Sequence, residues 1–436
     1  MKKIFIALSV LLLVSLSSSL LLAGGVDNRS NYSGEYVRTL NRNAATDSLD
    51  AIVYNPGGVM TMEDGIHGNL SLHYVMKDYT NTVNGVALEQ DRASFVPALF
   101  ALFKRDKWAG FFAGTIPAGG GEVEYDSGSA TTRIGATLLT NYLNSFYLSQ
   151  GLPGLAYGPI ANEKLEGESF YYGYTLGVAY KLDDFVSFSL AGRYIDADKK
   201  VRAGFQVTPT DLGSVAGAIA RTAVLNYKDE AEGFGLIFGM NISYEPFNIG
   251  VRYETETDLD FEYNVREDSI TGLPIALGSQ LGVINGLEHS RNLPALLAVG
   301  VGYKLTPKLR IDVNMTTYFQ EDADWEGAEN NVDDGWEAGI AVEYIVNPNL
   351  KLSAGYLYTQ TGMPAQYALK EAPELNANAF GAGLVYYVDK NLKVDCGLGF
   401  VDYESDSYID TLSGTPLLIG LEKDVVMLSA GVQYHF

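Results

Sequence analysis

From about residue 66 to the C-terminus, apolar and polar residues alternate with a period of two. In the stretch KLRIDVNMTTYF, one face would carry Leu309, Ile311, Val313, Met315, Thr317 and Phe319. The stretches NLKVDCGLGF and VVMLSAGVQYHF repeat the pattern near the C-terminus. Strict alternation indicates strands with one apolar and one polar face. An apolar outside and a polar inside are typical of a transmembrane barrel, whose closure leaves no strand edge unpaired in lipid.

Short and long connections alternate between these strands. Tight turns are expected at residues 104–107, 181–185, 244–248, 305–309, 346–350 and 388–392. Longer polar connections lie near residues 81–91, 126–166, 205–227, 265–290, 325–331, 364–374 and 406–420. This alternation favours an up-and-down barrel over a soluble sandwich or propeller. We predict an all-β transmembrane antiparallel β-barrel of about 14 strands over residues 66–436, with short periplasmic turns and long outer loops.

The N-terminus predicts export. Two lysines, an apolar run from Ile4 to Leu16 and small residues near Ala23 form a secretory signal peptide over residues 1–23. No later apolar run is long enough for a transmembrane helix. The single cysteine, Cys396, excludes an intrachain disulfide framework. The net charge of -23 argues against nucleic acid as a partner.

The last residues agree with a location in the bacterial outer membrane. Phe436 and Tyr434 share a face of the final strand. This arrangement resembles the terminal aromatic signal that the outer-membrane assembly machinery reads. The alternative is an ordinary last strand that ends in an aromatic residue.

A segment of about forty residues, 24–65, precedes the first strand and belongs to no predicted sheet. It contains Asn55, Pro56, Gly57 and Gly58 directly after an apolar run. Proline fixes φ and removes a donor. Glycine permits positive φ or a close backbone approach, and asparagine can bond neighbouring backbone groups. The motif alone predicts either a plain turn into the first strand or a compact reversal that could block a lumen.

The whole segment resembles the N-terminal hatch of the FadL family, outer-membrane transporters of long-chain fatty acids and aromatic hydrocarbons. In SGEYVRTLNRNAATDSLDAIVYNPGGVMTMEDG, the residues that match are Arg38, Arg42, Ala44, Ala45, Asp47, Asp50, Ala51, Tyr54 and the Asn-Pro-Gly-Gly motif. Gly57 and Val59 stand where the family usually has Ala and Leu. Residues 94–128 resemble the family's second and third strands. The resemblance implies a hatch over residues 24–65 that plugs the barrel and shifts when ligand binds beside it.

The family's ligand leaves sideways through a kink in the third strand. The corresponding stretch GTIPAGGGEVEY contains Pro117, Gly119, Gly120 and Gly121. Proline cannot donate to a strand ladder, and glycines within a strand mark bulges or bends. The alternative is that the third strand ends at Ile116.

The family also implies an outer-loop groove in which ligand first docks. In the loop at 131–165, helical spacing relates Leu138, Leu139, Tyr142, Leu143, Phe146 and Tyr147. An apolar helix outside the membrane needs a partner or a ligand. Loops near 211–224 and 273–287 are also apolar, so the three could pack together as a cap, which would itself form a groove.

A carboxylate head group would favour arginine in a low-dielectric site. Strand parity places Arg193, Arg252 and Arg310 on the inner face, whereas Arg38 and Arg42 lie in the hatch. Pairing with luminal Asp or Glu is the alternative for each of them.

We therefore predict passive uptake of hydrophobic ligands, with long-chain fatty acids first, and lateral release into outer-membrane lipid. Uptake of aromatic hydrocarbons is the alternative within the family. A general diffusion porin is a further alternative, but it predicts an open lumen. No enzyme, cofactor or metal is expected, because His67, His73, His289 and His435 accompany neither a nucleophile motif nor a metal-ligand spacing.

Overall fold

The computed structural model describes residues 33–436, in which one sheet closes on itself as a β-barrel. The wall has 14 antiparallel strands, and the last pairs with the first along nearly its whole length. The predicted fold class is confirmed. The wall strands are β1 (Gly65–Val83), β3 (Ser94–Arg105), β4 (Trp108–Tyr125), β5 (Tyr157–Lys181), β6 (Val186–Pro209), β7 (Arg221–Tyr244), β8 (Phe247–Glu254), β11 (Leu296–Thr306), β12 (Leu309–Tyr318), β13 (Gly335–Asn347), β14 (Leu350–Gln360), β15 (Ala377–Tyr387), β16 (Leu392–Tyr403) and β18 (Leu417–His435).

Four short strands extend the wall at one end: β2 (Val86–Gln90), β9 (Asp260–Ile270), β10 (Glu288–Ser290) and β17 (Asp406–Asp410). β9 continues the line of β8 along β7 after a break at residues 255–259, and β10 pairs with β9. The sequence did not predict these extensions, because the loops that carry them look polar and irregular.

The alternation of side chains is the one that a membrane barrel requires. In β12, Val313 and Met315 are exposed on the outside, whereas Asn314 and Thr316 are buried inside. Exposed aromatic rings gather beside the short turns, where Trp108 packs on Tyr180 and Phe185 on Tyr244. Aromatic girdles of this kind mark the interfaces of a lipid-facing band. No helix of the described residues is long and apolar enough to cross a membrane.

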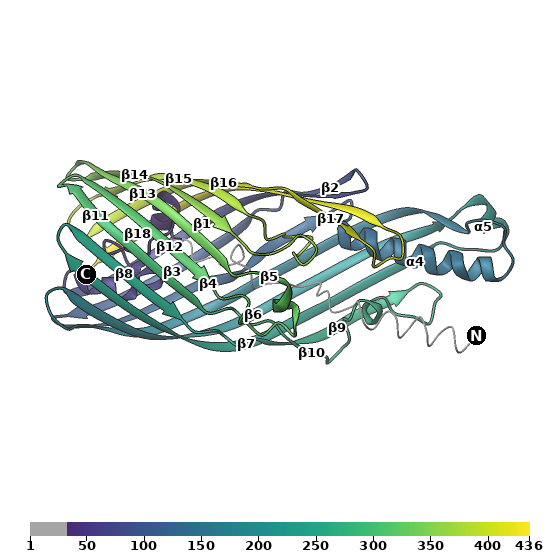
Figure 1. Cartoon of the computed structure of the whole chain (residues 1–436), viewed down its shortest axis with the longest axis horizontal. Helices are drawn as coiled ribbons and strands as arrows, with labels where there is room; N and C mark the ends of the chain where they lie inside the picture. The colour runs from purple at the N-terminus through teal and green to yellow at the C-terminus, as the bar shows by residue number, and fades with distance from the viewer. Residues whose placement is uncertain (1–32) are drawn as a thin grey trace.

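The barrel is much taller on one side than on the other (Figure 1). β5 has 25 residues, whereas β12 has 10. About ten residues of a tilted strand suffice to cross the membrane. The long strands therefore rise well beyond it and carry α4 (Ala130–Ser149) and α5 (Asp211–Val215) at their outer ends (Figure 1). The short 3-10 helices η3 (Gly278–Gln280) and η4 (Ala328–Asn331) lie in other long connections.

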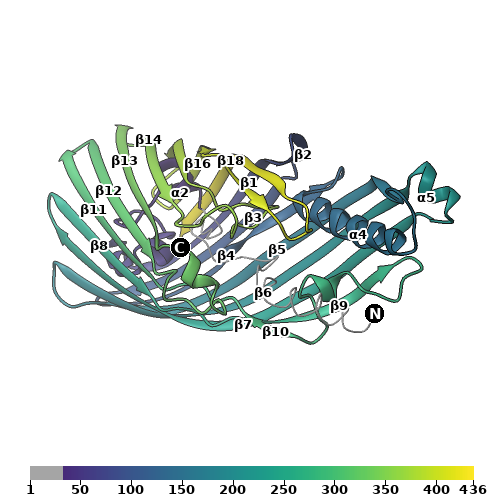
Figure 2. The same ribbon diagram turned by 45° about the vertical axis from the view of Figure 1, so that its right-hand side comes forward.

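Residues 33–64, which we call the luminal segment, lie inside the barrel near the end that carries the C-terminus (Figures 1 and 2). The segment contains α2 (Gly34–Thr39), α3 (Ala51–Tyr54) and η2 (Pro56–Thr61). α2 contacts β13–β16 and β18, and η2 contacts β4–β8. The segment thus bridges opposite walls. The predicted signal peptide and the first part of the predicted hatch, residues 24–32, lie outside the described residues.

Candidate functional site

Asn55 fixes the turn of the luminal segment between α3 and η2. Its Nδ2 donates to the carbonyl of Ala45 at 2.9 Å and to Oδ1 of Asn241 in β7 at 2.7 Å. Pro56 occupies the first turn of η2, where a missing N–H costs nothing. The motif is therefore a buried 3-10 turn held against the wall.

The two glycines of the motif are needed for close approach. Neither has a positive φ. A Cβ on Gly57 would lie 2.9 Å from the backbone nitrogen of Asn241, and one on Gly58 would lie 2.5 Å from the carbonyl oxygen of Ala45. The hydroxyl of Ser187 in β6 donates to the Gly57 carbonyl at 2.8 Å. A side chain at Gly57 would push the turn off the wall, and one at Gly58 would disrupt the packing of the segment on itself.

An ionic network ties the other half of the segment to the opposite wall. Arg38 is fully buried and pairs with Glu35 of its own helix and with Glu343 of β13. Lys393 of β16 donates to Glu35 at 2.8 Å, and Lys351 of β14 lies 2.9 Å from Glu343.

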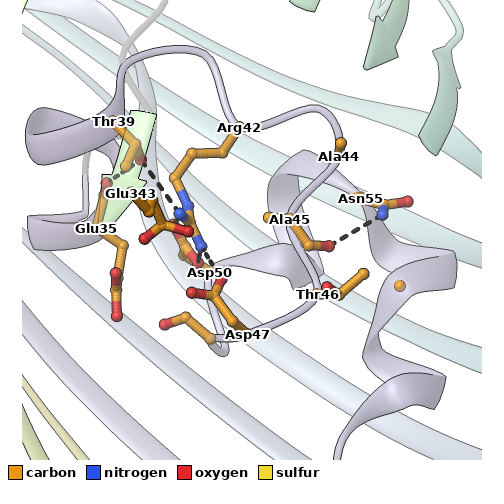
Figure 3. Close-up of polar contacts among 12 residues, drawn as sticks. Glu35, Thr39, Arg42, Ala44, Ala45, Thr46, Asp47, Asp50, Asn55 and Glu343 are labelled. Carbon is orange, nitrogen blue, oxygen red and sulfur yellow. Dashed lines mark hydrogen bonds and ion pairs between the residues drawn. The ribbon is translucent and has the colours of Figure 1, made fainter. Parts of the chain in front are cut away.

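A second arginine closes the segment on itself. Arg42 donates to Asp50 from Nε and to Asp47 from Nη2, both at 2.7 Å (Figure 3). Where the segment joins β1, Lys104 and the backbone N–H of Asp106 donate to Asp64 and hold the pKa of that carboxyl below its usual range.

Replacing Arg38 by methionine should destabilise the protein by about 3 kcal/mol, the lower end of the cost of breaking a buried ion pair. Glu35 and Glu343 would each lose one cation, but Lys393 and Lys351 would still neutralise them. Unfolding in urea, measured in lipid vesicles, gives the free energy. Arg105→Met is the matched control, because Arg105 is largely exposed and its carboxylate partner, Asp106, is 4.0 Å away. Equal stability of the two variants would show that the network does not hold the segment.

The three wall arginines named from the sequence are also engaged by acceptors. Arg193 pairs with Glu254, and Nε of Arg252 lies 3.3 Å from the same carboxylate. Arg310 donates to Asp312 and to the carbonyl of Ala44, both at 2.7 Å. The five arginines are thus split between the segment and separate parts of the wall, and each has an acidic neighbour.

The wall is interrupted between β3 and β4. The two strands pair from Arg105–Trp108 only as far as Leu99–Gly114. Beyond that point, residues 94–98 of β3 pair with β1 alone, and residues 115–125 of β4 pair with β5 alone. The result is a stretch of wall without β3–β4 backbone pairing, which we call the wall gap.

Pro117 and the three glycines lie in the part of β4 that borders this gap. β4 continues to Tyr125, so the strand does not end at Ile116. Its register against β5 shifts between Thr115 and Ala118 and again between Ala118 and Gly121. Gly119 and Gly121 have φ of 98° and 75°, a region that favours glycine. Gly120 lies between them.

Three residues that the sequence did not single out, Lys77, Ser94 and Glu122, form hydrogen bonds across the wall gap. The ammonium of Lys77 in β1 donates to Ser94 of β3 at 2.9 Å, to the carbonyl of Gly120 at 3.1 Å and to that of Glu122. The N–H of Glu122 donates to Ser94 at 3.1 Å. These bonds satisfy carbonyls that a regular ladder would otherwise pair. One feature of the sequence could have identified this site: Lys77 lies at a position of β1 whose side chain is expected to face inward, where a lysine is unusual.

The apolar outer-loop residues all lie on α4, but they face different ways. Leu139 and Leu143 are buried against Phe205 and Val207 of β6. Tyr142 and Phe146 are exposed, whereas Leu138 and Tyr147 are half-buried. The helix therefore packs on the inner face of the tall wall and leaves part of its apolar surface open.

Two cavities lie along the inside of the barrel. The inner cavity, of about 70 Å³, sits on the luminal segment, and its lining includes Tyr36, Leu40, Tyr54, Arg252, Tyr318 and Met427. The outer cavity, of about 90 Å³, lies between α4, the tall wall and the wall gap; its lining includes Gly120, Gly121, Gly135, Lys199, Phe205 and Tyr227. The glycines at the gap thus line an apolar cavity. No cluster of three or more metal-ligand side chains occurs in residues 33–436.

Solved structures with a similar fold include a FadL homologue and toluene transporters. A FadL homologue of Pseudomonas aeruginosa matches with a TM-score of 0.68 and 13% identity, over 94% of this chain and 99% of the other. The toluene transporter TbuX of Ralstonia pickettii matches with a TM-score of 0.62 and 15% identity, over 94% of this chain and 100% of the other. The toluene transporter TodX of P. putida matches with a TM-score of 0.60 and 13% identity, over 89% of this chain and 94% of the other. At these identities the likeness shows the fold alone.

A comparison with curated proteins finds no match. A family model does match, over residues 14–436, and describes an "Outer membrane protein transport protein (OMPP1/FadL/TodX)". This match covers nearly the whole chain and agrees with the barrel, so the protein belongs to the FadL/TodX family of outer-membrane transporters of hydrophobic compounds.

Proposed function

We propose that the protein carries small hydrophobic molecules, with monoaromatic compounds first, passively through the outer membrane and releases them sideways through the wall gap. The observation that carries the proposal is that β3–β4 pairing ends at Leu99–Gly114 and that, further along β4, Gly120 and Gly121 line the apolar outer cavity. Backbone groups left unpaired at membrane depth are costly. Here side-chain bonds from Lys77 replace the β3–β4 ladder. A gap that is kept free of ladder pairing beside Pro117 and two glycines of positive φ suggests a route into lipid.

The luminal segment would serve as the hatch of this path. It is buried, bridges opposite walls and underlies the inner cavity. A molecule that enters past the exposed part of α4 would meet the outer cavity and the wall gap before it meets the segment. Sideways release would let a hydrophobic ligand leave without crossing the polar periplasmic end.

Two observations favour a neutral aromatic ligand over a long-chain fatty acid. All five candidate head-group arginines have a carboxylate within 4.0 Å, so none offers a free charge. The outer cavity, about 90 Å³, is smaller than the apolar cavity of about 150 Å³ that binds benzene, so it holds at most a single ring and not a long acyl chain. TodX and TbuX, whose folds are similar, are toluene transporters. Fatty acids are the second candidate through the FadL homologue.

Labelled toluene should bind saturably to the purified full chain. Oleate and its neutral methyl ester should compete weakly and equally, because none of the five arginines is free to bind a carboxylate. Much stronger competition by oleate would make the protein a fatty-acid transporter. Absence of saturable binding, together with entry of small sugars into liposomes, would contradict the proposal and favour a diffusion porin.

A further inference from the structure

The wall gap is bridged from inside by a single ammonium group. Val75 is the last residue of β1 that pairs with β3, opposite Ser94, and Lys77 follows it at the next inward position. Nζ of Lys77 donates to the hydroxyl of Ser94 on the β3 edge and to the carbonyls of Gly120 and Glu122 on the β4 edge. The two edges, which share no backbone pairing here, are thus joined through one side chain and the Ser94 hydroxyl.

The ammonium lies at the margin of the outer cavity. A Cβ on Gly121 would come within 3.3 Å of Lys77 Nζ, and both Gly120 and Gly121 line the cavity. Lys77 itself is 3% exposed, so the gap is shut at this point. A molecule that leaves the cavity between β3 and β4 therefore has to displace this side chain.

The bonds of Lys77 are of a kind that can be broken and remade. All three acceptors are neutral oxygens. Hydrogen bonds from a charged donor are stronger than neutral ones, so the bridge holds the edges together. Separation of a buried ion pair would cost still more. The neighbouring charges are Lys423 of β18, which repels the ammonium, and Glu122, whose carboxylate already pairs with Arg92. The bridge can therefore open without separation of an ion pair.

A second contact crosses the gap nearer its outer end. Arg92, just before β3, donates to Glu122 from Nε and to Glu124 from Nη1, both at 2.8 Å. Its side chain is half exposed, and exposed ion pairs contribute little, because solvent and salt screen them. The buried Lys77 therefore provides the larger part of the closure.

We propose that Lys77 is the gate residue of sideways release. Its ammonium holds the edges of the wall gap together in the resting barrel. It leaves the carbonyls of Gly120 and Glu122 each time a ligand passes from the outer cavity into lipid. Lys77 is a positioning residue in this role, since it acts on the two strand edges and not on the ligand. This inference rests on the proposed sideways release and names the contact that controls its rate.

Exchange of 4-fluorotoluene between the barrel and lipid tests the gate. Fluorine NMR on the full chain in lipid nanodiscs follows the exchange. In Lys77→Met the ammonium is lost, so exchange should become about tenfold faster, the equivalent of one hydrogen bond to a charged group. The equilibrium affinity should stay unchanged, because a lower barrier speeds entry and exit equally. Lys423→Met removes a comparably buried ammonium that donates to the carbonyl of Pro373, and it should keep the native rate.

Two further variants separate a gate from a merely structural contact. Ser94→Ala removes two of the four bonds that join the edges, so it should speed exchange in the same direction but by less. Lys77→Cys, in a chain whose Cys396 is replaced by serine, should exchange as fast as Lys77→Met. Its reaction with 2-bromoethylamine before refolding restores an ammonium at the length of lysine and should return the native rate.

Each result decides between the gate and the route. Unchanged or slower exchange in Lys77→Met and Ser94→Ala, beside normal binding by the native chain, would overturn the gate and leave the proposed transport standing. Fast exchange that persists after the ammonium is restored would also overturn the gate. A native chain that neither binds nor exchanges the probe would overturn both. If Lys77→Met does not assemble, Ser94→Ala and the aminoethylated variant decide the question.

Discussion

A disulfide between Ser94→Cys and Gly121→Cys is expected to stop uptake of hydrophobic ligands. A Cβ on residue 121 would lie 3.0 Å from the Cβ of Ser94, so a small shift reaches the separation of about 3.8 Å that disulfides prefer. The bond would join β3 to β4 across the wall gap. If ligands leave through this gap, uptake into liposomes should fall to the rate of liposomes without protein.

Reduction of the bond provides the internal control. Cysteine at the left-handed position of Gly121 costs about 1–2 kcal/mol, and this cost is present in both redox states. Reduction should therefore restore uptake. The native Cys396 is replaced by serine throughout, and the single variant Ser94→Cys, treated with the same oxidant, should keep its uptake. Undiminished uptake after complete oxidation would place the exit elsewhere.

Deletion of residues 34–61 should convert the barrel into an ion-conducting pore. These residues bridge β4–β8 on one side and β13–β16 on the other, and nearly all of them are buried. Without them, the inward Arg, Lys, Asp and Glu side chains of the wall would border water. Single-channel recordings in planar bilayers should show a large rise in conductance over the full chain.

The matched control for this deletion shortens the chain outside the lumen. Removal of Asp211–Val215, the short helix α5, should leave conductance at the level of the full chain. Assembly of each variant can be checked by its heat-dependent migration in gels. An assembled barrel that lacks residues 34–61 and still does not conduct would mean that another part of the chain blocks the lumen.

The barrel could be predicted because its determinants are local. The outward Val313 and Met315 and the inward Asn314 and Thr316 follow directly from the period of two. The turns at Asp183 and Asp389 are likewise set by short polar stretches, since each carboxylate accepts from backbone N–H groups within three residues. The helix α4 could be predicted from apolar spacing in the same way.

The site could be predicted only in part, because its contacts depend on register between distant strands. Nothing in the sequence aligns Ser169 with Lys199 at the outer cavity; that alignment follows from the pairing of β5 and β6. Lys199 did carry a signal, since it shares the inward parity of Ala197 and Ala203. The wall arginines show both cases. Arg252 and Arg310 have a carboxylate two residues along the same strand, whereas the one that pairs with Arg193 of β6 comes from β8 and depends on the fold.

The pairing of β1 with β18, from His67–His435 to Val83–Ile419, has a consequence for how the chain matures. The seam joins the first wall strand to the last one synthesised, so nearly the whole chain must be ordered before it can form, and such long-range closure is slow. The luminal segment precedes β1 but bonds to β13, β14 and β16, which emerge late. Insertion of the luminal segment into a barrel that had already closed would require threading of the chain, which protein folds avoid. We therefore expect the cylinder to be completed around its own N-terminal segment, with sealing of the seam as the last step of biogenesis.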